Sequence, residues 1–390
     1  MKKRVSRSWA KKLPALIFML TLTGITGLFA IDIYLIPPEL GGDNPIRSQL
    51  QNEVNRVFAQ QKNRFQSVVQ GINGNPQDLI GAFATSSVFS SSGASLRAYQ
   101  GYDAFALTLG VMGGAQVPGN LFSWAFGFGD EMDNVLNIFD RTGDVQAGAN
   151  PQILNAQIGF NASKLLSKGL YLGLKGGFFN LNIPIDNYDF SFHTWSIGSL
   201  VNYQLIPQIK LPAGLLVWRG VNIGTGLIYQ RTRLTLGLPL FPDNGNVVIP
   251  MSVPTIGSII GEIRNAKFDM GFKINTFTVP LEAVTSIRLL GFVNASIGGG
   301  LDFGFGKAGL EGDINASISV YIPPGYNLRQ ENPGSFTVSM GGENSPALVN
   351  PKIMGSFGFS AGPAIILDIP ITYYFANKGY NIGITFGFVR

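Results

Sequence analysis

The last strand of the chain indicates its fold class: residues 380–389 read YNIGITFGFV. Alternate residues of a β-strand point to opposite faces. The residues of one face are apolar: Tyr380, Ile382, Ile384, Phe386 and Phe388. The residues between them are small or polar: Asn381, Gly383, Thr385 and Gly387. The stretch therefore predicts a strand with one apolar face and one face that can line a polar or crowded space.

The same alternation recurs in four further segments, at 104–111, 122–129, 267–274 and 313–322. A soluble β-sandwich would carry charged residues on its second face. Here that face is mostly Gly, Ala, Ser, Thr and Asn, and only 13% of the chain is charged, with 50 glycines. A strand between lipid and a lumen needs an apolar outer face and tolerates a small or polar inner one. The pattern favours a membrane β-barrel over a soluble β-protein.

The composition excludes several other classes. The 390 residues contain no cysteine, so a disulfide scaffold, a thiolate zinc site and a catalytic cysteine are excluded. The formal charge of +5 comes from the first thirty residues, which hold six basic residues and no acid up to Ala30. The remaining chain is close to neutral, so its charge gives no support for nucleic-acid binding.

The N-terminus has the order of a secretory signal peptide. Residues 2–12 are cationic, 13–29 are uncharged and mostly apolar, and the small residue Ala30 follows. We predict a signal peptide at 1–30, with an uncleaved inner-membrane anchor as the alternative. Beyond it, no stretch approaches eighteen consecutive apolar residues, so membrane-spanning helices are not expected in the mature chain.

With this signal and this final strand, the chain resembles Gram-negative outer-membrane β-barrel proteins as a class. The resemblance covers roughly residues 100–390 in pattern. It implies the cell outer membrane as the location, outer-membrane lipid and the barrel-assembly machinery as partners, and a small-molecule solute as cargo.

Alternating runs between turn residues predict an all-β fold, an antiparallel transmembrane barrel of 12–14 strands at 101–390. Twelve candidate strands fall at 102–111, 121–129, 152–162, 169–183, 189–203, 215–230, 265–277, 287–298, 312–322, 352–362, 364–375 and 379–389. An extra hairpin within 231–264 would make fourteen. The polar segment 323–351 is expected to be a long outer loop.

Residues 31–100 differ from the barrel in pattern. Apolar residues recur at helical spacing from Ile46 to Ile72, and a second short helix is expected from Leu79 to Phe89. The apolar stripe needs a partner surface. This helical segment is therefore expected either to pack in the periplasm against the barrel or to plug its lumen.

Four charged residues are candidate lumen groups: Lys175, Lys267, Asp269 and Lys273. The last three share a face of one strand, opposite its apolar row, and Lys175 and Asp103 occupy comparable positions. Charges inside a pore set its ion preference. The alternative is that they pair with one another or with the N-terminal helix and conduct nothing.

No catalytic residue, metal site or cofactor is predicted, and the chain is not expected to be an enzyme. The single histidine, His193, lies beside Trp195 and is interpreted as interfacial, because Ser196 has the opposite parity and Ser191 lacks a third orienting group. The acidic residues within 129–151 do not match a calcium-binding loop and indicate a solvated loop.

Three functions remain open. The first is a channel or porin for small solutes. The second is a plugged transporter of hydrophobic molecules, since the layout is similar to that of long-chain fatty-acid channels; Asn75-Pro76-Gln77 departs from their Asn-Pro-Ala motif at the third place. The third is a structural or adhesive surface protein that uses 323–351 as its binding loop. The sequence does not indicate the substrate or the oligomeric state.

Overall fold

The computed structural model describes residues 30–70, 76–93, 102–116, 148–185, 188–210, 215–239, 247–253, 257–322, 327–361 and 364–390. Residues 1–29 of the predicted signal peptide, the candidate strand at 121–129 and most of the acidic segment 129–151 lie outside these ranges. Two helices are described, α2 (Arg47–Gln70) and α3 (Pro76–Ser92). Neither is long and apolar enough to cross a membrane.

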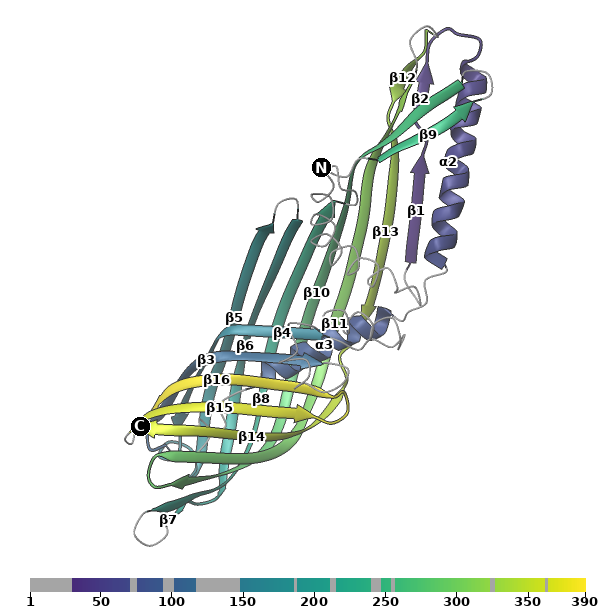
Figure 1. Ribbon diagram of the computed structural model, residues 1–390. Helices are drawn as coiled ribbons and strands as arrows, with labels where there is room; N and C mark the ends of the chain where they lie inside the picture. Colours follow the sequence, from purple (N-terminus) through teal and green to yellow (C-terminus); the bar gives the residue numbers. More distant parts are fainter. Residues whose placement is uncertain are drawn as a thin grey trace, which may run out of the picture.

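Most of the described chain is antiparallel β-strand (Figure 1). The first eight strands are β1 (Ala30–Ile36), β2 (Glu39–Gly41), β3 (Phe105–Gln116), β4 (Gly148–Asn161), β5 (Leu170–Ile185), β6 (Tyr188–Ile206), β7 (Ile209–Lys210) and β8 (Leu216–Pro239). The other eight are β9 (Val247–Val253), β10 (Gly257–Leu289), β11 (Val293–Tyr321), β12 (Arg329–Asn332), β13 (Gly334–Asn344), β14 (Val349–Ala361), β15 (Ile365–Tyr374) and β16 (Gly379–Val389).

The expected antiparallel barrel is confirmed. One sheet contains fourteen of the described strands, but the expected number of 12–14 was for the barrel alone, and not all strands of this sheet belong to the barrel. Ten of them form a closed ring in the order β11-β14-β15-β16-β3-β4-β5-β6-β8-β10, because β10 also pairs with β11. Each of the ten is paired on both sides, so the ring is complete.

The remaining strands of this sheet, apart from the short β7, lie beyond the ring. Together with helix α2 and the halves of β10 and β11 that run beyond the ring, they form what we call the extension; its further strands are β1, β9 and β13 (Figure 1). β11 pairs with β14 from Val293 to Phe303 and with β13 from Ala308 to Ile318. Between these two partners Gly306 has φ +125°, a conformation that L side chains rarely adopt. This glycine lies where the sheet passes from ring to extension.

The extension has its own apolar core. Leu50, Val54 and Phe58, which are four residues apart on α2, are buried against strand residues that include Phe336 and Val338 of β13. The spacing puts all three on one face of the helix. The part of the predicted stripe that contains Leu50, Val54 and Phe58 thus has its partner surface in the extension, at the end of the barrel opposite the C-terminus (Figure 1).

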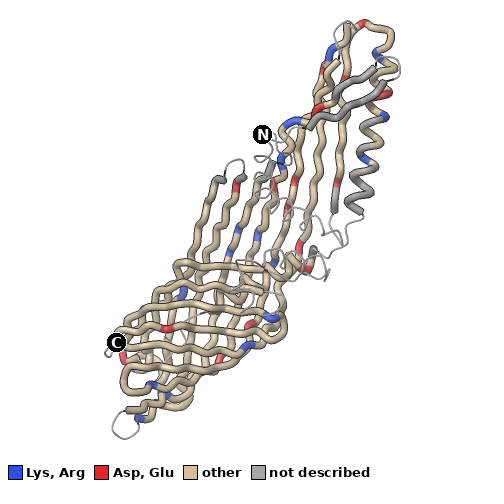
Figure 2. Tube along the Cα trace, viewed as in Figure 1, with Lys and Arg blue, Asp and Glu red and all other residues tan. Residues whose placement is uncertain are grey.

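The pattern of β10 inverts along its length. In the ring, Phe277, Leu281 and Ile287 are exposed on the outside while Thr276 and Thr278 are buried inside. In the extension, the inward residues of β10 are apolar and the outward ones include Lys267, Asp269 and Lys273. Figure 2 shows charged residues along the strands of the extension. An apolar exterior is typical of a strand in lipid, and a charged exterior of one in water. The membrane boundary therefore crosses β10 near residues 275–277.

Three aromatic side chains lie at this boundary on adjacent strands. The ring centroid of Tyr229 is 5.3 Å from that of Trp195 and 4.9 Å from that of Phe277. Aromatic girdles of this kind mark the interface between the apolar band and water in outer-membrane-type barrels. The closed ring, its apolar exterior and this girdle make the chain a transmembrane β-barrel of the outer-membrane type.

Three predictions about the strands were wrong: the strands expected within 265–322, the loop expected at 323–351, and a segment before the helices without a strand. The segments 265–277, 287–298 and 312–322 were expected to be three strands, but they form two long ones, β10 and β11, joined by a turn at 290–292. In this turn Leu290 has φ 50° and Gly291 has φ 78°. The segment 323–351, expected as a loop, contains β13, which pairs with both β11 and β1. β1 itself was not expected.

Candidate functional site

Helix α3 lies inside the ring (Figure 1). Its residues are held by groups that come from different sides of the wall: Thr276 on β10, Tyr374 on β15, Asn381 on β16 and Lys175 on β5. The first half of the helix packs through Ile80 and Ala84 on the apolar inward faces of β10 and β11, among residues such as Phe272 and Leu310. The second half reaches down into the polar part of the lumen.

Glycines in the wall form a seat for α3. A Cβ atom on Gly114 would lie 2.3 Å from the backbone nitrogen of Ser90, and one on Gly148 would lie 2.6 Å from the carbonyl oxygen of Ala82. Both contacts are with helix backbone, which cannot turn aside as a flexible side chain would. The helix backbone therefore approaches the wall more closely than any residue with a side chain allows.

Hydroxyl groups join α3 to the lumen wall. The Oγ atoms of Ser87 and Ser91 lie 2.9 Å and 2.7 Å from the Oγ1 atoms of Thr276 and Thr278, respectively. Ser92 Oγ lies 2.6 Å from the hydroxyl oxygen of Tyr374. All these groups are buried. Buried hydroxyls need partners, and here helix and barrel satisfy each other.

Two side chains hold the C-terminal end of α3. Lys175 donates from Nζ to the carbonyl oxygens of Ser91, at 2.5 Å, and Gly93. Asn381 donates from Nδ2 to the carbonyl oxygen of Phe89 at 2.6 Å. The last carbonyls of a helix lack partners within the helix and carry the negative end of its dipole. A buried lysine ammonium fits this position in both hydrogen bonding and charge.

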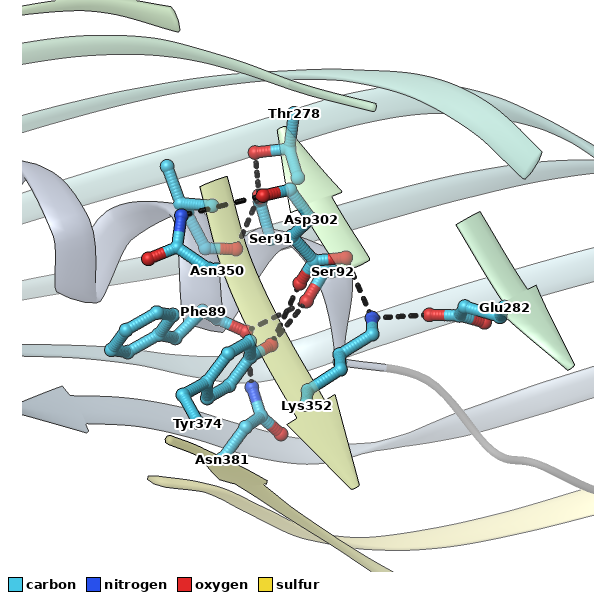
Figure 3. Close-up of polar contacts among 12 residues, drawn as sticks. Phe89, Ser91, Ser92, Thr278, Glu282, Asp302, Asn350, Lys352, Tyr374 and Asn381 are labelled. Carbon is cyan, nitrogen blue, oxygen red and sulfur yellow. Dashed lines mark hydrogen bonds and ion pairs between the residues drawn. The ribbon is translucent and has the colours of Figure 1, made fainter. Parts of the chain in front are cut away.

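Next to this helix end lies an ion network, drawn in Figure 3. Lys352 Nζ lies 2.5 Å from Glu282 Oε1 and 2.6 Å from Asp302 Oδ1, and Tyr374 donates its hydroxyl proton to Asp302 Oδ2 at 2.9 Å. The charged side chains are almost completely buried, at 1% exposure for Lys352 and 0% for Asp302. Because Ser92 also contacts Tyr374, the network is continuous with α3.

Beyond the end of α3, toward the C-terminal end of the barrel, the inner wall carries both polar and apolar side chains. The buried polar side chains include Thr108, Asn202, Asn222, Asn294, Ser296 and Thr385. The buried apolar side chains include Tyr171, Leu200, Ile228, Val284, Met354 and Ile366. The barrel thus has a partly polar lumen that α3 and the ion network occupy toward the extension.

The predicted lumen charges divide into two groups. Lys175 faces the lumen, where it binds the end of α3. Lys267, Asp269 and Lys273 do not: the apolar row beside them faces inward onto α3, so these charges lie on the water-exposed outside of the extension. Asp269 accepts a hydrogen bond from Lys267 and thereby raises the pKa of that ammonium. Asp103, just before β3, is also exposed rather than in the lumen.

The weaker candidates also have defined positions. His193 is half-buried on the outer face, with its ring against Phe178, and Ser191 beside it pairs with Thr235 at 2.6 Å. Ser196 faces the lumen and accepts a hydrogen bond from Gln152. Within the described ranges, no group of His, Asp and Glu side chains is arranged to hold a metal ion.

Glu282, Asp302, Lys352 and the serines of α3 were not predicted. A signal for the helix was present: residues 85–92 read TSSVFSSS, which is unusual for a water-exposed helix and suits one surrounded by polar groups. The three charges stand alone in otherwise small or apolar strand segments. Their pairing depends on strand register, which the sequence does not specify.

We expect Lys175→Met to loosen the end of α3. The two helix carbonyls would lose their charged donor in a buried place, at a cost of about 1–3 kcal/mol. This corresponds to roughly 5- to 150-fold faster amide exchange in residues 89–93, measured by hydrogen-deuterium exchange. Lys168→Met, in the exposed turn before β5, is the control and should leave exchange in α3 unchanged.

Comparisons with known proteins give one family and several distant structures. None of the curated proteins compared matches the chain. The translocator domain of the autotransporter NalP from Neisseria meningitidis is similar at 8% identity and a TM-score of 0.33, over 73% of this chain and 87% of that one. The toluene transporter TodX of Pseudomonas putida is similar at 10% identity and a TM-score of 0.24, over 81% and 98%.

The toluene transporter TbuX of Ralstonia pickettii is similar at 8% identity and a TM-score of 0.21, over 79% of this chain and 97% of that one. At such scores, likeness carries no functional argument. The outer-membrane location rests on the barrel itself, because a closed antiparallel ring with an apolar exterior is the β-structure that can span a membrane. The family assignment is direct, since the Lsa36-like family model matches residues 29–388, and the chain belongs to the Lsa36-like family.

Proposed function

We propose that this protein is an outer-membrane channel that α3 closes, and that small polar solutes cross it when α3 leaves its seat. One observation carries the proposal: a separate helix, joined to the wall mainly by hydroxyl and carbonyl hydrogen bonds, occupies a lumen whose wall carries many polar side chains. The proposal includes no catalytic step.

The polar lining also bears on the choice of cargo. Amide and hydroxyl side chains such as those of Asn202, Asn222 and Ser296 can exchange hydrogen bonds with a passing polar solute. A hydrophobic molecule would have to cross the same groups without satisfying them. The lining therefore supports a polar solute over a hydrophobic one.

A disulfide lock tests the role of α3. The chain has no cysteine, so Ser91→Cys with Thr278→Cys introduces a single possible crosslink between helix and wall, where the two hydroxyl oxygens are 2.7 Å apart. We expect the wild type to show intermittent openings in planar bilayers, the oxidised variant to be silent, and reduction to restore the openings.

Ser191→Cys with Thr235→Cys is the matched control, because these hydroxyls are 2.6 Å apart on the outside of β6 and β8. Oxidation of this pair should leave the openings unchanged. A wild type that never conducts, or a lumen lock that conducts as well when oxidised as when reduced, would contradict a gated channel.

The extension favours a second candidate, an anchor that displays a binding surface. β10 continues well beyond the boundary at 275–277 into a sheet with its own core around α2. Barrels of this type have short periplasmic turns, and the turn at 290–292 belongs to the C-terminal end. The extension would then stand on the outer side of the membrane, and a permanently silent barrel would favour this candidate.

A further inference from the structure

Basic side chains form a row on the outer surface of the barrel, just beyond the aromatic girdle on the side of the extension. Arg231 and Arg233 of β8 have the same outward parity as Tyr229 and follow it along the strand. Strand register puts Arg231 opposite Trp195, and Arg233 between His193 and Lys273. We refer to His193, Arg231, Arg233 and Lys273 as the basic row.

The two arginines are available for a ligand. Both are exposed, and in the described part of the chain neither forms an ion pair. Two nearby carboxylates pair with lysines rather than with these arginines: Glu311 lies 2.6 Å from Lys273, and Asp269 lies 3.0 Å from Lys267. Arg233 and Lys273 also line a surface pocket of about 510 Å³.

The position of the basic row along the barrel axis indicates which part of the membrane contacts it. Tyr229 and Phe277 lie at the edge of the apolar band. Tyr229 donates its hydroxyl proton to Oδ1 of Asn275 at 3.1 Å, and Asn275 is the first outward-facing polar residue of β10 beyond that band. Lipid headgroup phosphates lie at this depth, next to the interfacial aromatics. Guanidinium groups present forked donors that match phosphate oxygens.

We propose that Arg231 and Arg233 form a binding site for the phosphate of a membrane lipid headgroup. The ligand is a lipid rather than a dissolved anion, because its chains lie against the apolar band while its phosphate reaches the row. The pocket that Arg233 lines also contains the carboxylates of Asp189 and Asp313, which would repel an anion that entered it from water.

Lipid selectivity at Trp195 tests this proposal. The protein without residues 1–30, and therefore without Trp9, carries Trp124→Phe and Trp218→Phe so that Trp195 is its single tryptophan. It is placed in vesicles of phosphatidylcholine that contain increasing amounts of brominated phosphatidylglycerol. Quenching gives the binding constant of the anionic lipid relative to phosphatidylcholine. Each arginine near the surface contributes about 1 kcal/mol, or roughly fivefold. We expect a preference of at least fivefold that falls to about one in Arg231→Gln with Arg233→Gln.

Three controls make the outcome decisive. Arg231→Lys with Arg233→Lys keeps the charge and should keep most of the preference. Arg56→Gln with Arg329→Gln removes two exposed arginines from the distant part of the extension and should change nothing. Millimolar inorganic phosphate should not reduce the quenching. Equal quenching by both lipids, a preference that survives the glutamine variant, or competition by free phosphate would overturn the proposal.

Discussion

Gly114→Val is expected to convert a barrel that is closed most of the time into one that conducts persistently. The added Cβ would lie 2.3 Å from the nitrogen of Ser90 and 2.7 Å from the carbonyl oxygen of Ser86, and valine adds two further methyl groups. Neither helix backbone atom can turn away from the contact. The strand itself accommodates valine well. The helix must therefore leave its seat, and single-channel recordings should show long-lived ohmic steps.

Gly113→Val is the matched control for this experiment. Gly113 is the preceding residue of β3 and faces outward, and a Cβ there has nothing within 4 Å. The substitution has the same chemistry on the opposite face of the same strand, so it should leave both assembly and conductance unchanged. If Gly114→Val assembles and remains as silent as Gly113→Val, α3 does not control passage through this barrel.

Much of the architecture could be predicted because it depends on local patterns. The alternation of residues 380–388, the helical stripe from Ile46 and the second helix before Phe89 each involve neighbours within one segment. Lys175 could be assigned to the lumen for the same reason, since Leu174 and Phe178 beside it are lipid-facing residues of one strand.

The orientation of a strand face could not be predicted in this way. A period of two shows that Phe268, Met270 and Phe272 share a face, and both parts of β10 have this period. It does not show whether that face meets lipid or a buried helix. Lys267 and Lys273 were expected in the lumen because their apolar neighbours were assumed to face lipid, whereas those neighbours pack on α3.

The turn between β10 and β11 was missed for a related reason. Residues 289–293 read LLGFV, with only one of the usual turn residues, and they sit between two alternating runs. The glycine-rich stretch at 298–300 offered a more conventional break. In the structure that stretch lies within β11, where Gly300 would place a Cβ 2.1 Å from the carbonyl oxygen of Leu281 on the neighbouring strand.

Lys352→Met is expected to be the most destabilising single substitution in the lumen. It removes the only cation within 4.0 Å of Glu282 and Asp302 in the described structure and leaves two buried carboxylates beside each other. Breaking a buried ion pair by removing one partner costs about 3–5 kcal/mol. Chemical denaturation of the refolded protein in lipid vesicles measures this as a lower unfolding midpoint.

A charge-neutral triple variant separates the network's charge from its packing. Glu282→Gln and Asp302→Asn combined with Lys352→Met keep the side-chain volumes and remove all three charges, and buried ion pairs replaced as a whole are often neutral or stabilising. We expect most of the lost stability to return.

Lys307→Met is the control: it breaks an exposed pair with Glu343 and should have little effect on stability. If the triple variant is as unstable as Lys352→Met, shape rather than charge determines the role of Lys352. If it recovers stability but conducts, the ion network keeps the lumen closed together with α3, because Tyr374 links Asp302 to Ser92.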